Sequence, residues 1–76
     1  MNQQFTFGNL ANSLPPIIAR KKVAHYFGGA ISSKTLANAD SLGLGPKGRL
    51  KIGREVAYPT PALLEWIDNR TTFQVI

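Results

Sequence analysis

Cysteine is missing from this chain of 76 residues, and histidine occurs once. Without thiols the chain forms neither a disulfide framework nor a thiolate metal site, and His25 has no cysteine to join it in a metal centre. We therefore expect no metal and no other cofactor. The reducing cytoplasm is the simplest compartment for such a chain.

Long apolar runs are missing too, most clearly from the first nineteen residues. Segment 1–19 has no charged side chain and no continuous apolar stretch of the length that a signal peptide or membrane span needs. We expect neither, and no membrane partner. A chain of 76 residues has room for one small domain, whose folding removes about 60% of the unfolded surface from water.

The residue combinations of known catalytic sites are also lacking. His25 lies in a basic segment, where a histidine is usually a surface group rather than a general base. The sequence contains no glycine-rich phosphate loop with a Lys-Ser or Lys-Thr ending, and Glu65 and Asp68 have the pattern of solvated charges. We expect no catalytic residue, no small-molecule substrate and no enzymatic activity.

Acidic residues are scarce, with four against nine basic ones, which gives a formal net charge of +5. Segment 20–54 contains a single acid, Asp40, among most of the cations. Those cations are Arg20, Lys21, Lys22, Lys34, Lys47, Arg49, Lys51 and Arg54. One strongly cationic face is typical of a protein that binds a polyphosphate, and a basic surface kept for solubility is the alternative.

The first part of the chain divides at two adjacent prolines. Residues 1–16 are rich in Asn, Gln, Ser and Gly and end in Pro15-Pro16, which predicts a flexible N-terminal arm. From residue 17 apolar residues recur at helical spacing, and we predict a helix over 20–27 that ends at the glycine pair 28–29. Ile31 then points inward and anchors the turn to the next helix.

Ser32 is a strong N-cap for a second predicted helix over 33–42. Leu36, Ala39 and either Leu42 or Gly43 fall on one apolar stripe, so the opposite face is polar and has short side chains. Such a face lets a helix approach base edges closely, and a plain solvent-exposed face is the alternative. Asp40 would be repelled by phosphates unless it points away or pairs with a cation of the hairpin that follows.

The next segment predicts a β-hairpin whose two-residue turn is Gly53-Arg54. We expect its alternating apolar residues to form one face that covers the helix pair. These residues are Leu50, Ile52, Val56 and Tyr58. Cations then project from the approach loop, the outer face and the tip, where they suit phosphate contact; the alternative is that they protect an exposed sheet edge from aggregation.

Thr60-Pro61 predicts the start of a third helix, with a hydroxyl N-cap followed by proline at the first helical position. Trp66 shares a stripe with other apolar residues of this helix, so we assign it to the core rather than to a base-stacking surface. The tail 71–76 is short and β-prone. The domain thus spans 17–70, and its fold class is mainly α with a small β-hairpin, an α+β winged helix-turn-helix.

These segments together resemble the excisionase-like, MerR-type winged helix-turn-helix family, which includes phage and genomic-island excisionases and AlpA-type prophage regulators. The resemblance covers about residues 17–69. Its residues are Arg20-Lys21-Lys22-Val23-Ala24 before Tyr26-Phe27-Gly28, Ile31-Ser32 with Lys34-Thr35-Leu36, Lys51-Ile52-Gly53-Arg54 with Val56 and Tyr58, and Ala62-Leu63-Leu64-Glu65-Trp66-Ile67. Members of this family bind double-stranded DNA without catalysing chemistry.

The resemblance also implies which residues contact DNA. Base-edge contacts are expected from the recognition helix, through Ser33, Lys34, Thr35 and Asn38. Wing contacts are expected from Arg49, Lys51 and Arg54. From the charge pattern we add Lys47 to the wing, and we add Arg20, Lys21 and Lys22 of the first helix as contacts to the DNA backbone.

The function that the resemblance implies is that of an excisionase, or recombination directionality factor. Such a protein binds and bends attachment-site DNA and thereby assists a tyrosine integrase in excision. An AlpA-type transcriptional regulator of a prophage or mobile element is the alternative, and a winged helix module used only for protein interaction is a further one. The expected partners are double-stranded DNA, an integrase and neighbouring copies of the chain on DNA.

Overall fold

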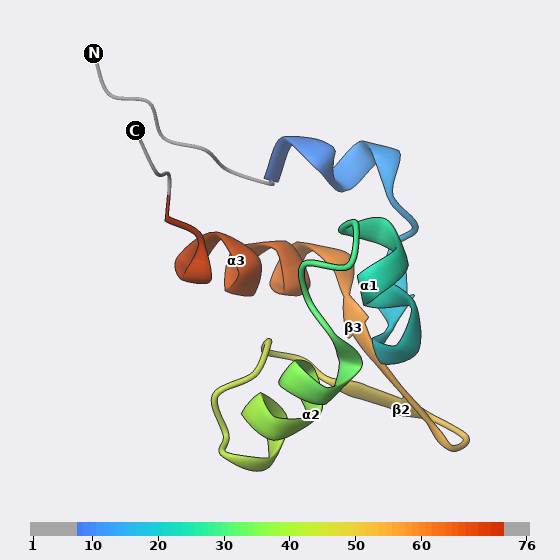
Figure 1. Ribbon diagram of the computed structural model, residues 1–76. Coiled ribbons are helices and arrows are strands. Elements are labelled where there is room, and N and C mark those ends of the chain that lie inside the picture. The colour runs from blue at the N-terminus through green and yellow to red at the C-terminus, as the bar shows by residue number, and fades with distance from the viewer. Residues whose placement is uncertain (1–7, 73–76) are drawn as a thin grey trace.

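The computed structural model describes residues 8–72, which contain three α-helices and a three-stranded antiparallel sheet (Figure 1). The elements in chain order are the 3₁₀ helix η1 (Gly8–Ser13), strand β1 (Ile17–Ala19), the 3₁₀ helix η2 (Arg20–Lys22), helix α1 (Val23–Tyr26), helix α2 (Ser33–Ser41), strand β2 (Leu50–Ile52), strand β3 (Glu55–Pro59) and helix α3 (Thr60–Arg70). The predicted α+β class is confirmed. No helix in this part of the chain combines the length and apolar composition needed to cross a bilayer.

Strand β1 is the element that the sequence analysis missed. The helical spacing of apolar residues begins at residue 17, but residues 17–19 pair antiparallel with β3. Strand β3 is therefore the central strand in the order β1-β3-β2. The pair Ile18–Tyr58 lies in the core, with both side chains fully buried. Three residues are too few for periodicity to separate strand from helix. The predicted first helix is correspondingly divided into η2 and the short α1.

The hairpin register differs from the predicted one. The two-residue turn at Gly53-Arg54 is confirmed, with a positive φ of 62° at Gly53. A turn of this length pairs Ile52 with Glu55 and Leu50 with Ala57, so Leu50 and Ile52 lie on the sheet face opposite Tyr58. Leu50 and Ile52 are therefore exposed, Ile52 at 60%, and the prediction of one shared apolar face was wrong.

Helix α2 begins as predicted, because the Ser32 hydroxyl accepts a hydrogen bond from the Thr35 amide at 3.0 Å. It ends at Ser41 in a glycine-dependent cap, in which Gly43 has φ 75° and the amides of Gly43 and Leu44 bond back to the carbonyls of residues 40 and 39. This early end turns Leu42 outward to 71% exposure, which corrects its predicted place on the apolar stripe.

The hydrophobic core lies between the sheet, α2 and α3. Its buried side chains are Ile18, Val23, Leu36, Ala39, Tyr58, Leu63, Trp66 and Ile67, and Leu14, Phe27, Ile31 and Val56 pack against it. The predicted core position of Trp66 is confirmed, and its indole N–H donates to the Leu44 carbonyl at 2.8 Å. This bond ties the loop after α2 to α3, so the loop that leads into the hairpin starts from a fixed point.

Thr60 joins the N-terminal segment to α3 rather than capping that helix. Its hydroxyl donates to the Pro15 carbonyl, and its amide donates to the Pro16 carbonyl at 2.9 Å. The predicted hydroxyl cap was therefore wrong, although Pro61 lies in the first helical turn as expected. Helix η1 lies against α3 (Figure 1). The rest of the predicted arm, 1–7, and the end of the predicted tail, 73–76, lie outside the described residues.

Candidate nucleic-acid interface

The exposed side of α2 is a polar ridge, which we define as Lys34, Asn38 and Ser41. All three are exposed, and their helical spacing puts them opposite the buried Leu36 and Ala39. An exposed amide at Asn38 with a cation one turn earlier is suited to hydrogen bonding with base edges and phosphates. Ser33, also predicted to contact bases, is exposed in the first turn of the helix.

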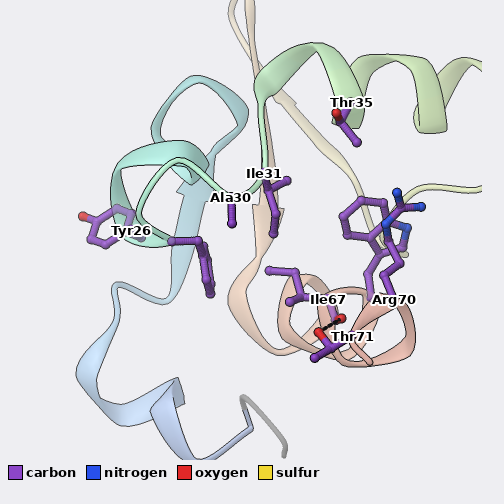
Figure 2. Close-up of a pocket in the computed structure, with 9 residues that line it drawn as sticks. Tyr26, Ala30, Ile31, Thr35, Ile67, Arg70 and Thr71 are labelled. Atoms are coloured by element: carbon purple, nitrogen blue, oxygen red, sulfur yellow. Dashed lines mark hydrogen bonds between the residues drawn. The ribbon is translucent and has the colours of Figure 1, made fainter. Parts of the chain in front are cut away.

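Thr35 lies apart from this ridge. Its hydroxyl is 3.0 Å from the Ser32 hydroxyl, and its side chain lines an apolar groove together with Ile31 and Trp66 (Figure 2). The amide and the hydroxyl of Thr35 are therefore both engaged with the N-cap residue Ser32, on the side of the helix that faces α3. Of the predicted base-contacting residues, the structure brings Lys34 and Asn38 together and separates Thr35 from them.

The hairpin and its approach loop gather cations around two shallow depressions. One, of about 380 Å³, is lined by Arg20, Leu50 and Val56 with three hairpin cations: Arg49, Lys51 and Arg54. The other, of about 400 Å³, lies between the C-terminal end of α2 and the loop that carries Lys47 and Arg49. Arg49 borders both depressions and so links the end of α2 to the hairpin.

Helix α2 and the hairpin tip lie on the same side of the molecule. In the view of Figure 1 both are at the bottom, whereas η1 and α3 lie above them. The predicted hairpin residues, namely Lys47, Arg49, Lys51 and Arg54, are all exposed, and they line the two depressions that meet at Arg49. We call the polar ridge together with these four cations the basic face.

Asp40 is the buried centre of a polar network beneath this face. Its side chain is 4% exposed, and Oδ2 accepts hydrogen bonds from Arg20 Nη2 at 2.6 Å and from the Tyr58 hydroxyl at 2.5 Å. Arg20 Nε also donates to the Tyr58 hydroxyl at 3.0 Å, which closes a triangle between η2, α2 and β3. On the other side, Oδ1 lies 3.7 Å from Arg49 Nη1. Asp40 therefore points inward and also pairs with Arg49 beside the hairpin. Either arrangement was expected to keep this acid from repelling phosphates.

Gly45 leaves room for this carboxylate. A Cβ at position 45 would lie 1.9 Å from Asp40 Oδ1, far inside any allowed contact, so the carboxylate would have to shift. A larger residue at position 45 would therefore displace the carboxylate from its bonds with Arg20 and Tyr58. The sequence offered one signal for the network, namely a lone acid among many cations, but it gave no indication that Tyr58 would supply the third side chain.

The predicted backbone-contacting cations of the first segment have different environments. Arg20 belongs to the Asp40 network and is 24% exposed at its side chain. Lys21 forms an exposed ion pair with Glu55 at 3.4 Å, and Lys22 is exposed. An exposed pair of this kind contributes little to stability. Arg20 thus has a structural role that the sequence analysis did not predict, and the DNA contacts of all three residues stay predictions.

The network also shifts two pKa values. The hydrogen bond with Tyr58, followed by the one with Asp40, raises the pKa of Arg20, so its guanidinium stays charged. Burial raises the pKa of Tyr58, and the hydrogen bond that its hydroxyl donates to Asp40 raises it further. The folded state therefore keeps the Tyr58 proton that the network needs.

Alkaline pH is expected to destabilise the wild-type protein more than Tyr58→Phe. The unfolded chain releases the Tyr58 proton at about pH 10, whereas the folded state holds it to higher pH. The stability that this hydroxyl contributes is thus complete below about pH 10 and is lost as the pH rises through the folded pKa. Urea unfolding followed by Trp66 fluorescence between about pH 8 and pH 11 measures it. A difference in unfolding free energy between the two proteins that stays constant over this range would contradict the prediction.

A separate apolar groove of about 640 Å³ lies between the α1–α2 connection and the C-terminal half of α3 (Figure 2). Tyr26, Ile31 and Ile67 line it, and Arg70 stands at one end with its guanidinium carbon 4.6 Å from the centre of the Trp66 ring. Figure 2 shows Tyr26 at the far side of the groove from Arg70. None of the residues that line the groove belongs to the basic face.

Within residues 8–72, no group of three or more His, Asp or Glu side chains is placed to hold a metal ion. His25 is exposed and contacts the Tyr26 ring edge-on, with ring centroids 5.2 Å apart.

Comparisons of the chain with models of protein families, with curated proteins and with solved structures found no match.

Proposed function

We propose that this chain is a DNA-binding accessory protein with sequence preference, an excisionase that binds and bends attachment-site DNA to assist a tyrosine integrase. In this proposal the fold is a winged helix-turn-helix. Helices α1 and α2 form the helix-turn-helix pair, the ridge on α2 enters the major groove, and the β2–β3 hairpin is the wing. The protein acts in the cytoplasm, where the DNA of a mobile element is found.

The observation that carries the proposal is the joint position of two kinds of side chain. The ridge of α2 offers Asn38, whose amide matches the donor and acceptor edge of adenine, and Lys34 for a guanine or a phosphate. Lys51 and Arg54 of the two-stranded ribbon line one depression with Arg49, which also borders the end of α2, and they suit the sugar-phosphate backbone or the minor groove. Base reading and backbone binding are thus available to one duplex at once.

Binding to duplex DNA is expected to weaken steeply with salt. Each phosphate that a lysine or arginine neutralises makes the slope of log K against log salt more negative by about 0.9. The four cations of the hairpin and its approach loop therefore predict a slope near −4. Fluorescence anisotropy of a labelled duplex, titrated at several salt concentrations, measures this slope. A flat salt response would contradict DNA binding through the basic face.

Excision and transcription control share the same binding chemistry, so a second experiment separates them. An excisionase should bend its site and stimulate excision by a purified integrase of the same element, which is measured by gel mobility of circularly permuted fragments and by a recombination assay. Site-specific binding with no effect on excision, together with repression or activation of a nearby promoter, would favour the alternative of an AlpA-type regulator.

A protein-interaction module is the second candidate, and the apolar groove beside α3 is the observation that favours it. A surface depression lined by Tyr26, Ile31 and Ile67 suits an apolar side chain of a partner such as the integrase or a neighbouring copy. The salt series decides between a role in DNA binding and one in protein interaction alone, because only the former predicts a steep slope.

A further inference from the structure

We propose that Asp40 is a positioning residue, which fixes Arg49 between the polar ridge of α2 and the hairpin and so sets how the two meet one duplex. The inference rests on the proposed function of the basic face. Asp40 itself is buried and would not touch DNA. Its effect on DNA binding would pass through Arg49, whose side chain is 50% exposed.

The two oxygens of the Asp40 carboxylate have different neighbours. Oδ2 is bound to Arg20 and Tyr58, which belong to η2 and the central strand β3 and therefore fix the carboxylate to the body of the domain. Oδ1 faces Arg49 at 3.7 Å. A rigid charge on one side of an otherwise half-exposed arginine restricts its rotamers, and this ordering is complete before DNA arrives.

Arg49 lies at the place where ordering has most effect on the interface. It directly precedes β2, follows the loop that leaves α2, and borders both the depression at the end of α2 and the one at the hairpin. In this proposal the ridge enters the major groove and the hairpin contacts the DNA backbone nearby. A guanidinium held at Arg49 contacts a phosphate between these two places. The position of Arg49 thus determines whether both sets of contacts form on the same DNA.

Asp40→Asn separates positioning from a simple effect of charge. The asparagine oxygen can still accept the bonds from Arg20 and Tyr58, while its amide presents donors to Arg49, which then loses its anchor. The formal net charge rises from +5 to +6, since one acid is removed. Long-range attraction alone predicts tighter DNA binding for this variant, whereas a positioning role predicts weaker binding.

The experiment is a double-mutant cycle of Asp40→Asn and Arg49→Ala, with affinity for a specific duplex and its salt slope as readouts. We expect Asp40→Asn to weaken binding about tenfold and make the slope less negative by about one, and Arg49→Ala to have little further effect in that background. Tyr58→Phe is the matched control, since it removes one Oδ2 bond while Arg20 still holds the carboxylate beside Arg49. We expect it to reduce stability and leave the effect of Arg49→Ala intact.

Equal or tighter binding by Asp40→Asn, with a full effect of Arg49→Ala, would overturn the inference while leaving the proposed function intact. Wild-type protein with a flat salt response would remove the proposed function and this inference together. If Asp40→Asn does not fold, the ¹⁵N relaxation of the Arg49 side chain in the wild-type protein decides. An ordered Nε–H supports positioning, and one as mobile as that of Arg54 rejects it.

Discussion

Arg20→Met is expected to lower the free energy of unfolding by about 3 kcal/mol, because it leaves the buried Asp40 carboxylate without its shortest ion pair. This value is at the low end of the range for broken buried pairs, since Arg20 is partly exposed and Arg49 remains 3.7 Å from Oδ1. A domain of 76 residues has roughly 4–11 kcal/mol of stability in total. Urea unfolding followed by the fluorescence of Trp66 measures the loss.

The double variant Arg20→Met/Asp40→Asn provides the control. Removing both charges leaves no unpaired ion in the interior, so we expect this variant to be more stable than Arg20→Met alone. Lys21→Met is the matched surface control, because its pair with Glu55 is exposed and its loss should change stability by less than about 1 kcal/mol. Equal losses from Arg20→Met and Lys21→Met would show that the network adds nothing to stability.

Lys51→Ala/Arg54→Ala is expected to weaken DNA binding by roughly fifty- to a hundredfold at 0.1 M salt, to similar extents on many sequences. Each lost phosphate contact removes about 0.9 from the slope of log K against log salt, which at this salt is nearly a tenfold change in K per contact. The slope should thus become less negative by about two. Titrations of specific and scrambled duplexes across a salt series measure both quantities.

Two single variants test whether the effect depends on place rather than on charge. Arg54→Ala and Arg70→Ala each remove one cation, but Arg70 stacks on Trp66 at the apolar groove, outside the basic face. Only Arg54→Ala should make the slope less negative. Asn38→Ala should instead relax preference at one base pair, by about 1–3 kcal/mol. Equal weakening on all sequences by Asn38→Ala would exclude its role in base reading.

Local sequence signals predicted the helices after residue 30 well, because their determinants lie within a few residues of one another. Ser32 caps α2 through the amide three residues later, and Gly43 ends it through bonds to the preceding turn. Strand β1 was missed because it is three residues long and is stabilised by pairing with β3, about forty residues away in sequence. Nothing local to residues 17–19 indicates that partner.

The hairpin shows the same limit in another form. Its turn was predicted from Gly53-Arg54, but the faces depend on which residues stand opposite one another, and a two-residue turn pairs even positions of β2 with odd positions of β3. Leu50 and Ile52 consequently share a face with Ala57 and not with Tyr58. The prediction assumed that apolar and polar residues alternate across the turn in one series, but the reversal of the chain changes which residues share a face.

By itself the sequence determined the charge of the basic segment, the capped start of α2, the two-residue turn and the core position of Trp66, since each depends on residue type or on near neighbours. Only the tertiary structure decided that Asp40 is neutralised rather than exposed to solvent. Its partners Arg20, Arg49 and Tyr58 come from three other segments, and bonds between such segments exist only once packing brings them together. The same packing puts α2 and the hairpin tip on one side of the molecule (Figure 1).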